Sequence, residues 1–485
     1  MAKLTTLSDD ARIALDNLGD AATSLWEPGL RFGVTGLSRA GKTVFITSLV
    51  HNLIHGGRLP LFSAQAQGRI AGASLKQQPD DGMPRFRYED HLHALLEDRV
   101  WPSSTSAISQ LRIKIEFESA STWSRTFGAG SLTLDIVDYP GEWLLDLPLL
   151  GKSYDQWASE AIAMAHLPNR KDEAKHWLKM LETVDGNEPA DEMRARELAE
   201  TFTAYLKACR QDKTALSTLP PGRFLMPGDL EGSPALTFAP IAPPAHEEVK
   251  SDDSLHAMMS RRYESYKSIV VKPFFRDHFA RMDRQIVLVD VLQALNAGAE
   301  SVKDLETALM EILECFNHGK RSWLTSLFTA RTDRILFAAT KADHLHHENH
   351  DRLEAILAKL VERASSRAHF RGAETDVVAM AAIRATREAE ITQGKETLPV
   401  IVGQPLAGET MGDETFDGNT ETAIFPGDLP DDPATVLSED HKAGDLKFLR
   451  FTPPKLDKTA EGLTLSLPHI RLDRALEFLL GDHLR

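Results

Sequence analysis

Residues 31–50, RFGVTGLSRAGKTVFITSLV, hold the feature that most constrains how this chain can fold. The apolar run 31–35 predicts a short strand, and KTVFITSLVHNLIHG (42–56) predicts an amphipathic helix that ends near two glycines. Between them, Gly36-Leu-Ser-Arg-Ala-Gly-Lys-Thr43 fits the pattern G-x-x-x-x-G-K-[ST]. A strand that passes through such a loop into a helix is typical of α/β folds that bind phosphate groups.

The loop has the residue types that a phosphate site needs. Small residues let the backbone curl so that successive N–H groups point inward, at the positive end of the following helix. Lys42 would reach the β and γ phosphates of a nucleotide, and the Thr43 hydroxyl would bind Mg²⁺. The predicted nucleotide contacts here are Gly36, Ser38, Arg39, Ala40, Gly41, Lys42, Thr43 and Val44. This pattern alone fits ATP as well as GTP.

A second motif, Asp138-Tyr-Pro-Gly141, follows the apolar run LTLDIVD. An acid at the carboxyl end of a strand beside the loop strand can hold a water on Mg²⁺, and Gly141 would let the backbone approach the γ phosphate. Asp135 is the alternative metal residue, but it lies earlier in the strand, where alternation turns its side chain elsewhere. The four-residue pattern alone does not indicate a metal site, and only its position at the end of this strand makes it informative.

A third motif, Thr340-Lys-Ala-Asp343, ends the apolar run RILFAA. The Asp343 carboxylate can accept both the N1–H and the N2–H₂ of guanine, a donor pair that adenine lacks, while the Lys341 stem would cover the base and tie back to the glycine loop. In the following MAAIR, a backbone N–H of Ala382 or Ile383 would meet the guanine O6. These residues favour a guanine nucleotide.

These four motifs, in this order, resemble the G-domain superfamily of P-loop GTPases, the group that includes Ras-like proteins. The rest of the chain is similar to the YcjX family of bacterial stress-associated nucleotide-binding proteins, on the stretches RFGVTGLSRAGKTVFITSLVHNLI, VDYPGEWLLDLPLL and RLDRALEFLLGD and on a large helical insertion. The resemblance runs end to end. It implies GTP and GDP binding and a link to the stress response, and it brings no effector with it.

In familiar G domains, a threonine between the first helix and the second strand closes over Mg²⁺ when the γ phosphate is present. Here that segment, 58–108, is long, and Thr105 in WPSSTSA is the candidate. Rivals for the role are Ser103, Ser104 and Ser106. The structural alternative is a polar loop tip.

Residues beside the γ phosphate predict slow hydrolysis. Glu142 stands where Ras-like members have a glutamine that orients water, and a carboxylate there is repelled by phosphate. Arg39 could swing over the phosphates as a charge stabiliser, or could be a solvated side chain whose backbone alone matters. The predicted catalytic residues are Lys42, Glu142 and Arg39, and the predicted metal residues are Thr43, Thr105 and Asp138.

Apolar strands that alternate with helices predict an α/β fold, a P-loop NTPase of the Ras-like kind with a mostly parallel sheet and a large, mainly α-helical insertion. Strands are expected at 111–117, 131–138, 285–295, 333–343 and 376–386, with the first two forming a hairpin. The expected division is an N-terminal helix 1–27, a G domain in the parts 28–142 and 281–390, a helical insertion 143–280, a loop-rich or small β insertion 391–464, and a C-terminal helix 465–485.

Composition excludes several other classes of protein. A net charge of −16 argues against a broad nucleic-acid surface, so no nucleic acid is expected as a partner. The two cysteines, Cys209 and Cys315, lack metal or redox spacing, and no apolar run reaches membrane-spanning length, so we expect a cytoplasmic protein. The apolar stripe of residues 4–26 could rest on a membrane, but its acidic polar side favours packing on protein.

Two further stretches have both a functional and a structural interpretation. HLHHENH (344–350) could bind a metal through His346 and His350, or could be a solvated helix start. SRRYESYKSIVVKPFF (260–275) could touch an anionic partner, or could be a helix face with extended basic side chains.

The sequence thus predicts a conformational switch that binds GTP or GDP with Mg²⁺ and hydrolyses GTP slowly. An unknown protein effector would act through 143–280, because that insertion begins directly after Gly141. The alternatives are a GDP-bound interaction scaffold with negligible turnover and an ATP-using P-loop ATPase.

Overall fold

A computed structural model describes most of the chain. The described residues are 29–37, 39–103, 107–120, 130–211, 219–243, 252–315, 332–369, 373–393, 396–438, 446, 448–456 and 466–485. The predicted N-terminal helix 1–27, Ser38, and the switch candidates Thr105, Ser104 and Ser106 lie outside these residues.

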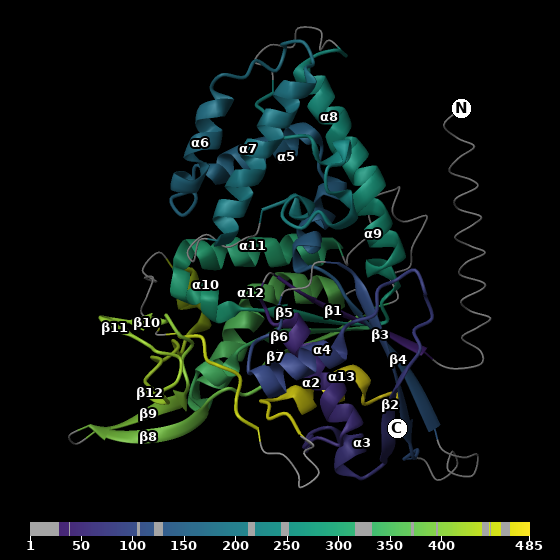
Figure 1. Cartoon of the computed structure of the whole chain (residues 1–485), viewed down its shortest axis with the longest axis vertical. Helices are drawn as coiled ribbons and strands as arrows, with labels where there is room; N and C mark the ends of the chain where they lie inside the picture. Colours follow the sequence, from purple (N-terminus) through teal and green to yellow (C-terminus); the bar gives the residue numbers. More distant parts are fainter. Residues whose placement is uncertain are drawn as a thin grey trace.

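A seven-stranded sheet forms the centre of the fold (Figure 1), in the order β2-β3-β4-β1-β5-β6-β7. Strands β4, β1, β5, β6 and β7 run parallel, while β3 is antiparallel to both β4 and β2. The fold is therefore α/β with a mixed, mostly parallel sheet, as the sequence predicts. The bounds are β1 Gly29–Gly36, β2 Ile70–Lys76, β3 Ser109–Phe117, β4 Gly130–Asp138, β5 Arg284–Val289, β6 Arg334–Ala339 and β7 Glu374–Ala379.

Most predicted strands are confirmed, with two kinds of error. The hairpin of β3 and β4 has the expected antiparallel pairing, from Ser109 opposite Asp138 to Phe117 opposite Gly130. The predicted strand 285–295 is wrong in its second half, because the Asp290 side chain accepts a hydrogen bond from the Gln293 N–H (3.1 Å) and caps helix α10. The predicted strands 333–343 and 376–386 likewise end early, and edge strand β2 was not expected.

The sheet is buried on both faces, and side chains alternate between them. Ile286 and Leu288 of β5 belong to the core that α2 (Lys42–Ile54) and α13 (Leu472–Leu480) cover. Val287 and Val289 belong to the core on the other face, covered by α11 (Ala299–Cys315) and α12 (His350–His369). This alternation explains the continuous apolar runs in the sequence.

The remaining helices before the insertion and beside the sheet are short. They are α3 Ser63–Ala66, α4 Tyr88–His93 and α10 Val291–Ala297. The insertion follows β4 with a 3₁₀ segment, η3 Gly141–Gly151, and then with α5 Tyr154–Ala165, α6 Lys171–Leu181, α7 Glu192–Gln211, α8 Leu255–Tyr266 and α9 Lys272–Asp277.

The helical insertion stacks on one edge of the sheet layer, above α11 in Figure 1. Its interior is aromatic: the Trp157 and Tyr263 rings stack with centroids 5.0 Å apart, and the Trp177 and Tyr205 rings with centroids 5.1 Å apart. These residues belong to the same hydrophobic cluster as Phe337 of the sheet. The insertion therefore shares a continuous core with the sheet and is not a loosely attached module.

A small β element lies in 387–393 and 396–424; it begins before the predicted loop-rich or small β insertion 391–464 and overlaps it. Strands β8 (Arg387–Gln393), β9 (Glu396–Gly403) and β12 (Thr422–Ile424) make an antiparallel sheet, with a short hairpin of β10 (Thr410–Met411) and β11 (Glu414–Thr415). This unit projects beside the main sheet in Figure 1 and has its own small core.

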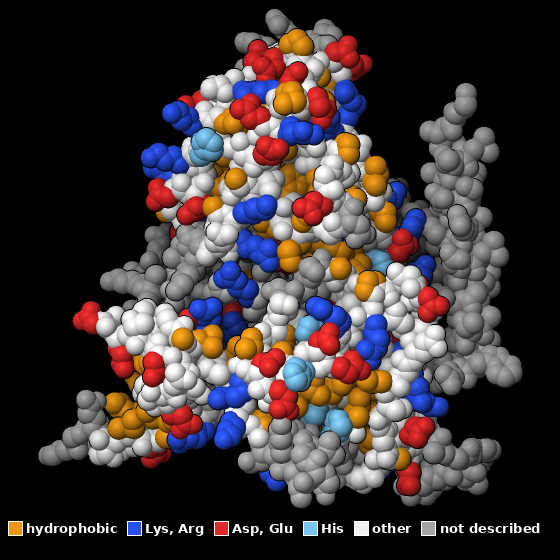
Figure 2. All heavy atoms as spheres, viewed as in Figure 1, with side chains coloured by type: hydrophobic (Ala, Val, Ile, Leu, Met, Phe, Trp, Pro, Cys, Tyr) orange, Lys and Arg blue, Asp and Glu red, His pale blue; other side chains and the backbone are white. Residues whose placement is uncertain are grey.

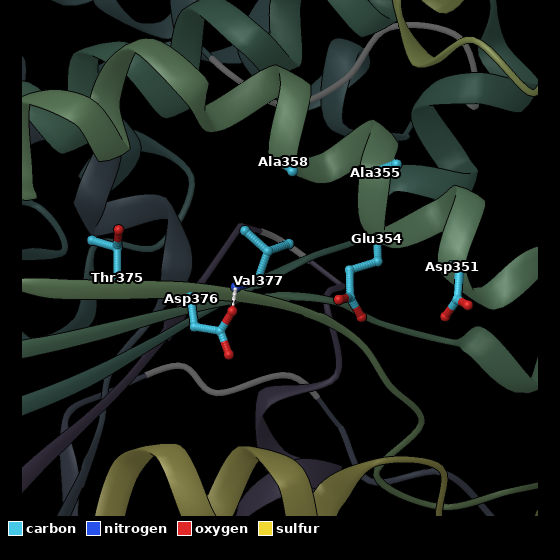
Figure 3. Close-up of a pocket in the computed structure, with 7 residues that line it drawn as sticks. All are labelled: Asp351, Glu354, Ala355, Ala358, Thr375, Asp376 and Val377. Carbon is cyan, nitrogen blue, oxygen red and sulfur yellow. Dashed lines mark hydrogen bonds between the residues drawn. The ribbon is translucent and has the colours of Figure 1, made fainter.

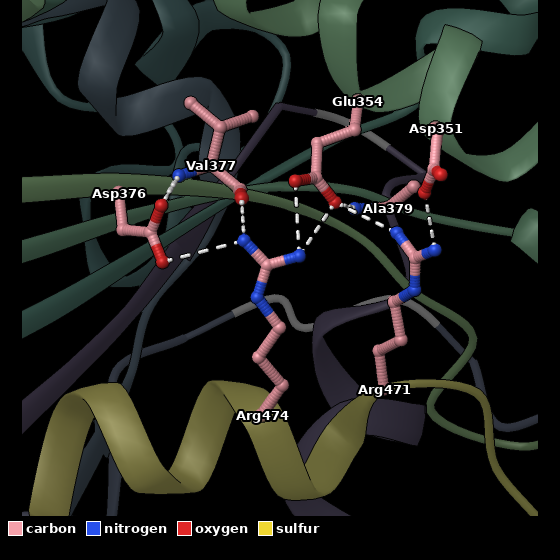
Figure 4. A network of polar contacts seen from close by, with 7 residues as sticks. All are labelled: Asp351, Glu354, Asp376, Val377, Ala379, Arg471 and Arg474. Atoms are coloured by element: carbon pink, nitrogen blue, oxygen red, sulfur yellow. Dashed lines mark hydrogen bonds and ion pairs between the residues drawn. The ribbon is translucent and has the colours of Figure 1, made fainter.

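Helix α13 is attached to the sheet by an ionic network as well as by its apolar face. Figure 4 shows Arg471 and Arg474 converging on Glu354 of α12, at 2.8 and 2.9 Å. A second Arg474 nitrogen donates to the Val377 carbonyl oxygen of β7 (3.2 Å). The C-terminal helix is thus bound to the helix on the opposite face, around the edge of the sheet.

Candidate functional site

The glycine loop lies at the carboxyl end of β1 and has the backbone that its sequence predicts. A Cβ on Gly36 would lie 2.5 Å from the Leu288 carbonyl oxygen, so only glycine fits there. Gly41 (φ 84°) and Arg39 (φ 64°) adopt left-handed conformations that turn the chain into α2. The Arg39 side chain is exposed, which favours the interpretation in which its backbone matters.

Lys42 is a buried cation at the centre of this loop. Its Nζ donates to the Gly36 carbonyl oxygen (3.2 Å), and the residue is 8% exposed. Burial lowers the pKa of Lys42, while the Asp138 and Glu142 carboxylates act in the opposite direction. Thr43, next along α2, is also buried. The loop therefore holds a positive charge next to inward-facing backbone, which suits a polyanion.

The D-x-x-G motif meets the glycine loop directly. Asp138 pairs with Val34 in the β1–β4 register, so both motifs leave the same edge of the sheet. A Cβ on Gly141 would lie 1.9 Å from the Gly36 carbonyl oxygen and 2.9 Å from Lys42 Nζ. Gly141 is therefore required for this close approach of the two loops.

The alternative metal residue, Asp135, lies away from this site. Both of its carboxylate oxygens accept hydrogen bonds from Arg112 of the neighbouring strand, at 2.6 and 2.7 Å. Its role in the structure is a cross-strand ion pair.

Glu142 is a buried carboxylate with a cationic partner that the sequence did not indicate. Its Oε1 lies 2.8 Å from Arg210 Nη2, and Glu142 is 4% exposed. Arg210 comes from the C-terminal end of α7 in the insertion. A Cβ on Gly222 would lie 1.7 Å from the Glu142 carbonyl oxygen, so the insertion also presses on the Glu142 backbone.

The rest of η3 is held by the insertion in the same way. The Arg223 guanidinium lies 3.1 Å from the Trp143 ring centroid. Asp146 accepts hydrogen bonds from the Tyr266 hydroxyl (2.6 Å) and the Gly222 N–H (2.7 Å). We name the contacts of Glu142, Trp143 and Asp146 with Arg210, Gly222, Arg223 and Tyr266 the clasp.

The predicted guanine motif follows β6, on the same edge of the sheet. The Thr340 N–H donates to the Val289 carbonyl oxygen (2.9 Å), and Lys341 takes a left-handed conformation (φ 62°). Asp343 is 4% exposed and accepts a hydrogen bond from the Ala385 N–H (2.9 Å). A carboxylate can accept about four hydrogen bonds, so this contact leaves capacity for a base.

The Lys341 ammonium forms an ion pair with Asp290. Asp290 is a site residue that the sequence prediction missed, although an acid directly after an apolar strand was the available signal. Because β5 lies between β1 and β6, this pair joins the middle of the sheet edge to the guanine motif.

The predicted small-residue turn lies against the phosphate-loop helix. The Ala382 carbonyl oxygen accepts a hydrogen bond from Ser48 Oγ of α2 (2.6 Å). Ile383 packs in a small cluster with Leu95, beside Val44. The turn after β7 therefore connects the two ends of the candidate site.

The chain before the switch candidates is tethered to the C-terminal part of the molecule. Trp101 Nε1 donates to the Phe451 carbonyl oxygen (2.6 Å), and Arg99 Nε donates to that of Pro453 (3.1 Å). Ser103 is exposed. The tethers give 448–456, for which the sequence indicated no role, a position close to the predicted switch.

The histidine stretch is largely structural. His350 Nε2 lies 2.8 Å from the Ala342 carbonyl oxygen, and the His344 ring meets Phe451 edge to face. His346 and His350 are buried, so the expectation of a solvated helix start is wrong for both. Within the described residues, His346, His347 and Glu348 are close enough to share a metal ion.

The basic helix 260–275 uses several of its cations within the fold. Arg262 donates to the Thr237 carbonyl oxygen (2.9 Å), and Lys267 donates to Glu264 and to the Lys152 carbonyl oxygen (2.8 and 2.9 Å). These contacts favour the structural interpretation. On the face in Figure 2, acidic and basic side chains are interspersed over the insertion, without a continuous basic surface.

A pocket of 430 Å³ lies elsewhere, between α12 and β7 (Figure 3). Asp351, Glu354 and Asp376 line it, together with small and apolar residues of the described part of the chain. Carboxylates do not attract phosphate, and the neighbouring cations Arg471 and Arg474 are already paired with these three carboxylates. This pocket therefore does not compete with the loop edge as a nucleotide site.

In the described part of the chain, no helix is both long and apolar enough to span a bilayer.

Comparisons with known proteins agree with the resemblance seen in the sequence. The model of the "YcjX-like family, DUF463" matches residues 30–484. A protein of Escherichia coli (strain K12) described as "Ras-like GTPase YcjX" is 38% identical over 467 residues, which cover 94% of this chain and 96% of the relative. A protein of Shewanella oneidensis with the same description is 34% identical over 475 residues, which cover 94% of each chain.

Proposed function

This chain belongs to the YcjX-like family, and we propose that it binds GTP and GDP at the Lys42 loop and acts as a switch that hydrolyses GTP slowly. One observation carries the proposal: Gly36, Lys42 and Gly141 meet at the carboxyl edge of the sheet. The two motifs follow the neighbouring parallel strands β1 and β4, so the phosphate loop and the metal motif lie side by side, as a site for a nucleotide with Mg²⁺ requires.

The base side of the site supports guanine. Asp343 follows β6 as a buried carboxylate, and the Ala382–Ile383 turn lies between it and α2. A carboxylate selects guanine because it accepts from both N1–H and N2–H₂. Both relatives carry the name "Ras-like GTPase", which agrees with this choice.

The residues around Lys42 also fit Mg²⁺. Thr43 and Asp138 supply a hydroxyl and a carboxylate, both buried at the loop, and oxygen ligands are those that Mg²⁺ prefers. When bound there with a triphosphate, the ion would neutralise charge on the β and γ phosphates.

Hydrolysis would depend on positioning and electrostatics. Lys42 and the loop N–H groups would stabilise negative charge on the phosphates. Glu142 cannot orient the attacking water as a glutamine amide would, and its buried carboxylate faces Arg210 instead. These features support turnover that is slow in the absence of a partner.

The switch would act on the insertion. Segment η3 begins at Gly141 and is enclosed by the clasp. A γ phosphate at Lys42 would therefore shift η3 and, through the clasp, the helices of 143–280. We therefore propose this insertion as the effector region, with 28–142 and 281–390 as the two parts of the G domain. A role in the bacterial stress response is part of the proposal through the family resemblance alone.

Nucleotide binding and phosphate release by the purified protein test the proposal. Wild type should bind GDP and release phosphate from GTP, and Lys42→Ala should lose both because the phosphates lose their buried cation. Lys76→Ala, at an exposed lysine on edge strand β2, is the matched control and should behave as wild type.

The alternatives give different results in the same assay. Tight GDP binding with phosphate release no faster than that of Lys42→Ala would indicate a GDP-bound scaffold. Equal competition by ATP and GTP would remove the argument from Asp343 and favour an ATPase.

A further inference from the structure

We propose that Arg210 is a ligand of the nucleotide's γ phosphate, supplied by the helical insertion of the same chain. The inference rests on the proposed function and deepens it, because it names the group that distinguishes GTP from GDP. In the structure described here, Arg210 is paired with Glu142, and the third phosphate would take over that guanidinium.

The geometry brings Arg210 to the phosphate end of the site. Arg210 Nη2 lies 2.8 Å from Glu142 Oε1, and Glu142 directly follows Gly141. Gly141 in turn touches Lys42, since a Cβ there would lie 2.9 Å from Nζ. The positive charge of Arg210 acts on Lys42 and lowers the pKa of its ammonium. Two cations from distant parts of the chain therefore converge on one buried place.

The charges at this place are balanced for an exchange of partners. Asp138 and Glu142 act on the buried Lys42, and Glu142 also pairs with the partly exposed Arg210, so each cation has an acidic neighbour. A γ phosphate at Lys42 would repel the Glu142 carboxylate and attract the guanidinium. Arginine suits this role because its planar fork binds phosphate through two parallel hydrogen bonds.

Arg210 is also free enough to move. Its side chain is 22% exposed, and within the described residues its contact besides Glu142 is a weak one, from Nη1 to the Met226 sulfur (3.4 Å). Arg39, the arginine within the loop, has an exposed side chain, whereas Arg210 pairs with a buried carboxylate next to Gly141. Of these two arginines, the structure therefore favours Arg210 as the charge stabiliser.

The exchange would couple the third phosphate to the insertion. Arg210 lies one residue before the end of α7, and the clasp residues Gly222 and Arg223 follow it in the chain. Withdrawal of Arg210 from Glu142 would free the first residue of the clasp. GDP has no γ phosphate and would leave the Glu142–Arg210 pair intact.

The test compares the affinities of GDP and GTPγS and the single-turnover rate of GTP hydrolysis in four variants. Arg210→Ala should bind GDP like wild type, bind GTPγS about tenfold more weakly, and hydrolyse GTP about 10³-fold more slowly, as for arginines that contact transferring phosphates. Arg210→Lys should retain part of the GTPγS affinity. Arg194→Ala, at the start of the same helix, is the matched control and should match wild type.

Glu142→Gln separates a direct role from a structural one. Because it removes the competing carboxylate, it should raise the ratio of GTPγS to GDP affinity. If Arg210 merely fixed Glu142, Glu142→Gln and Arg210→Ala would change this ratio in the same direction, which would overturn the inference.

The outcomes distinguish this inference from the proposed function. If wild type binds neither nucleotide, the proposed function fails and the inference fails with it. If wild type binds both, and Arg210→Ala keeps the wild-type affinity ratio and rate, the inference alone is overturned. Equal loss of GDP and GTPγS affinity in Arg210→Ala would likewise overturn it.

Discussion

Lys42, a single residue, shows why this edge of the sheet suits a polyanion. A buried ammonium is costly unless it is paired and hydrogen-bonded, and here Asp138, Glu142 and the Gly36 carbonyl oxygen supply the partners. Those partners keep the charge in place before a ligand binds. Phosphates would then replace part of this pairing with stronger charge-assisted hydrogen bonds.

Asp343→Asn should change which base is preferred. The amide keeps one acceptor but turns a donor toward the guanine N2–H₂, so two hydrogen bonds to a charged group are lost or weakened. At about 1.5 kcal/mol each, the loss corresponds to roughly a hundredfold in GDP affinity. Xanthosine diphosphate, which carries an acceptor at that position, should bind the variant better than GDP does, as measured by equilibrium titration.

Asp351→Asn is the control for this change, since that carboxylate lies on α12 with its side chain 86% exposed. It should leave both affinities unchanged. Unaltered GDP affinity in Asp343→Asn would contradict the assignment of Asp343 to the base.

Asp146 gives the clasp a dependence on pH. Burial raises the pKa of its carboxyl to about 6, against the hydrogen bonds from Tyr266 and Gly222 that favour the charged form. Between about pH 4 and 6 the folded protein keeps a proton that the unfolded chain has lost, so this group's contribution to stability falls as pH rises.

The free energy of unfolding of Asp146→Asn, relative to that of wild type, should therefore rise as the pH rises. The free energy of unfolding of wild type minus that of the variant should fall between pH 4 and 7, by at most about 3 kcal/mol. Denaturant titrations at a series of pH values measure this difference, and other titrating groups cancel in it. A difference that stays flat across the range would show that Asp146 does not titrate there.

Local sequence patterns predicted where the loop residues lie. Contacts between distant parts of the chain, which such patterns do not show, decided the partner of Glu142. The positions of Gly36, Lys42 and Asp138 at one edge of the sheet were predictable because they follow from a strand, a turn and a helix in sequence. Arg210 was not, because its partner lies 68 positions away and nothing around Arg210 marks it. The sequence shows the negative charge of Glu142, but it does not show that Arg210 pairs with it.

At the scale of elements, the clasp connects η3 to the chain segment after α7. Gly222 is the tightest point, because a Cβ there would lie 1.7 Å from the Glu142 carbonyl oxygen. Backbone cannot yield as a flexible side chain does, so the two segments depend on this glycine.

Gly222→Ala should destabilise the protein by about 1–3 kcal/mol, the usual cost of overpacking a tight site. It should also lower the GTPγS affinity, because Glu142 and its neighbour Gly141 must move. Thermal unfolding and nucleotide titration check the two effects. Gly72→Ala, where a Cβ would meet nothing within 4 Å, should be neutral; a Gly222 variant as stable as that control would contradict the close contact.

Edge strand β2 and the early end of β5 show where element prediction failed. The sequence IAGASLK has only two large apolar residues, Ile70 and Leu75, and none of its residues is fully buried, as suits an edge strand with one partner. The apolar run of β5 continues into α10, and only the capping contact of Asp290 divides them. Periodicity does not show such a boundary in a continuous apolar run.

At the scale of the whole molecule, the insertion and one face of the sheet share a hydrophobic core. Units with a common core are expected to unfold together, whereas separate domains unfold independently. The division into domains that the sequence suggested therefore describes the order of segments in the chain better than their independence.

Calorimetry of the full chain should show one main transition. Saturating GDP should raise the midpoint temperature of the whole transition. A ligand of the folded state stabilises that state by about 2.7 kcal/mol at a hundred times its dissociation constant. Two separate transitions, only one of them shifted by GDP, would contradict the shared core.

Competition between GDP and ADP at equilibrium tests whether a guanine nucleotide binds at the Lys42 loop with its base at Asp343. The phosphates of the two ligands are the same, so the base alone decides the result. Wild type should prefer GDP by at least about a hundredfold, because adenine lacks the donors that Asp343 requires. Equal affinity for GDP and ADP would contradict it.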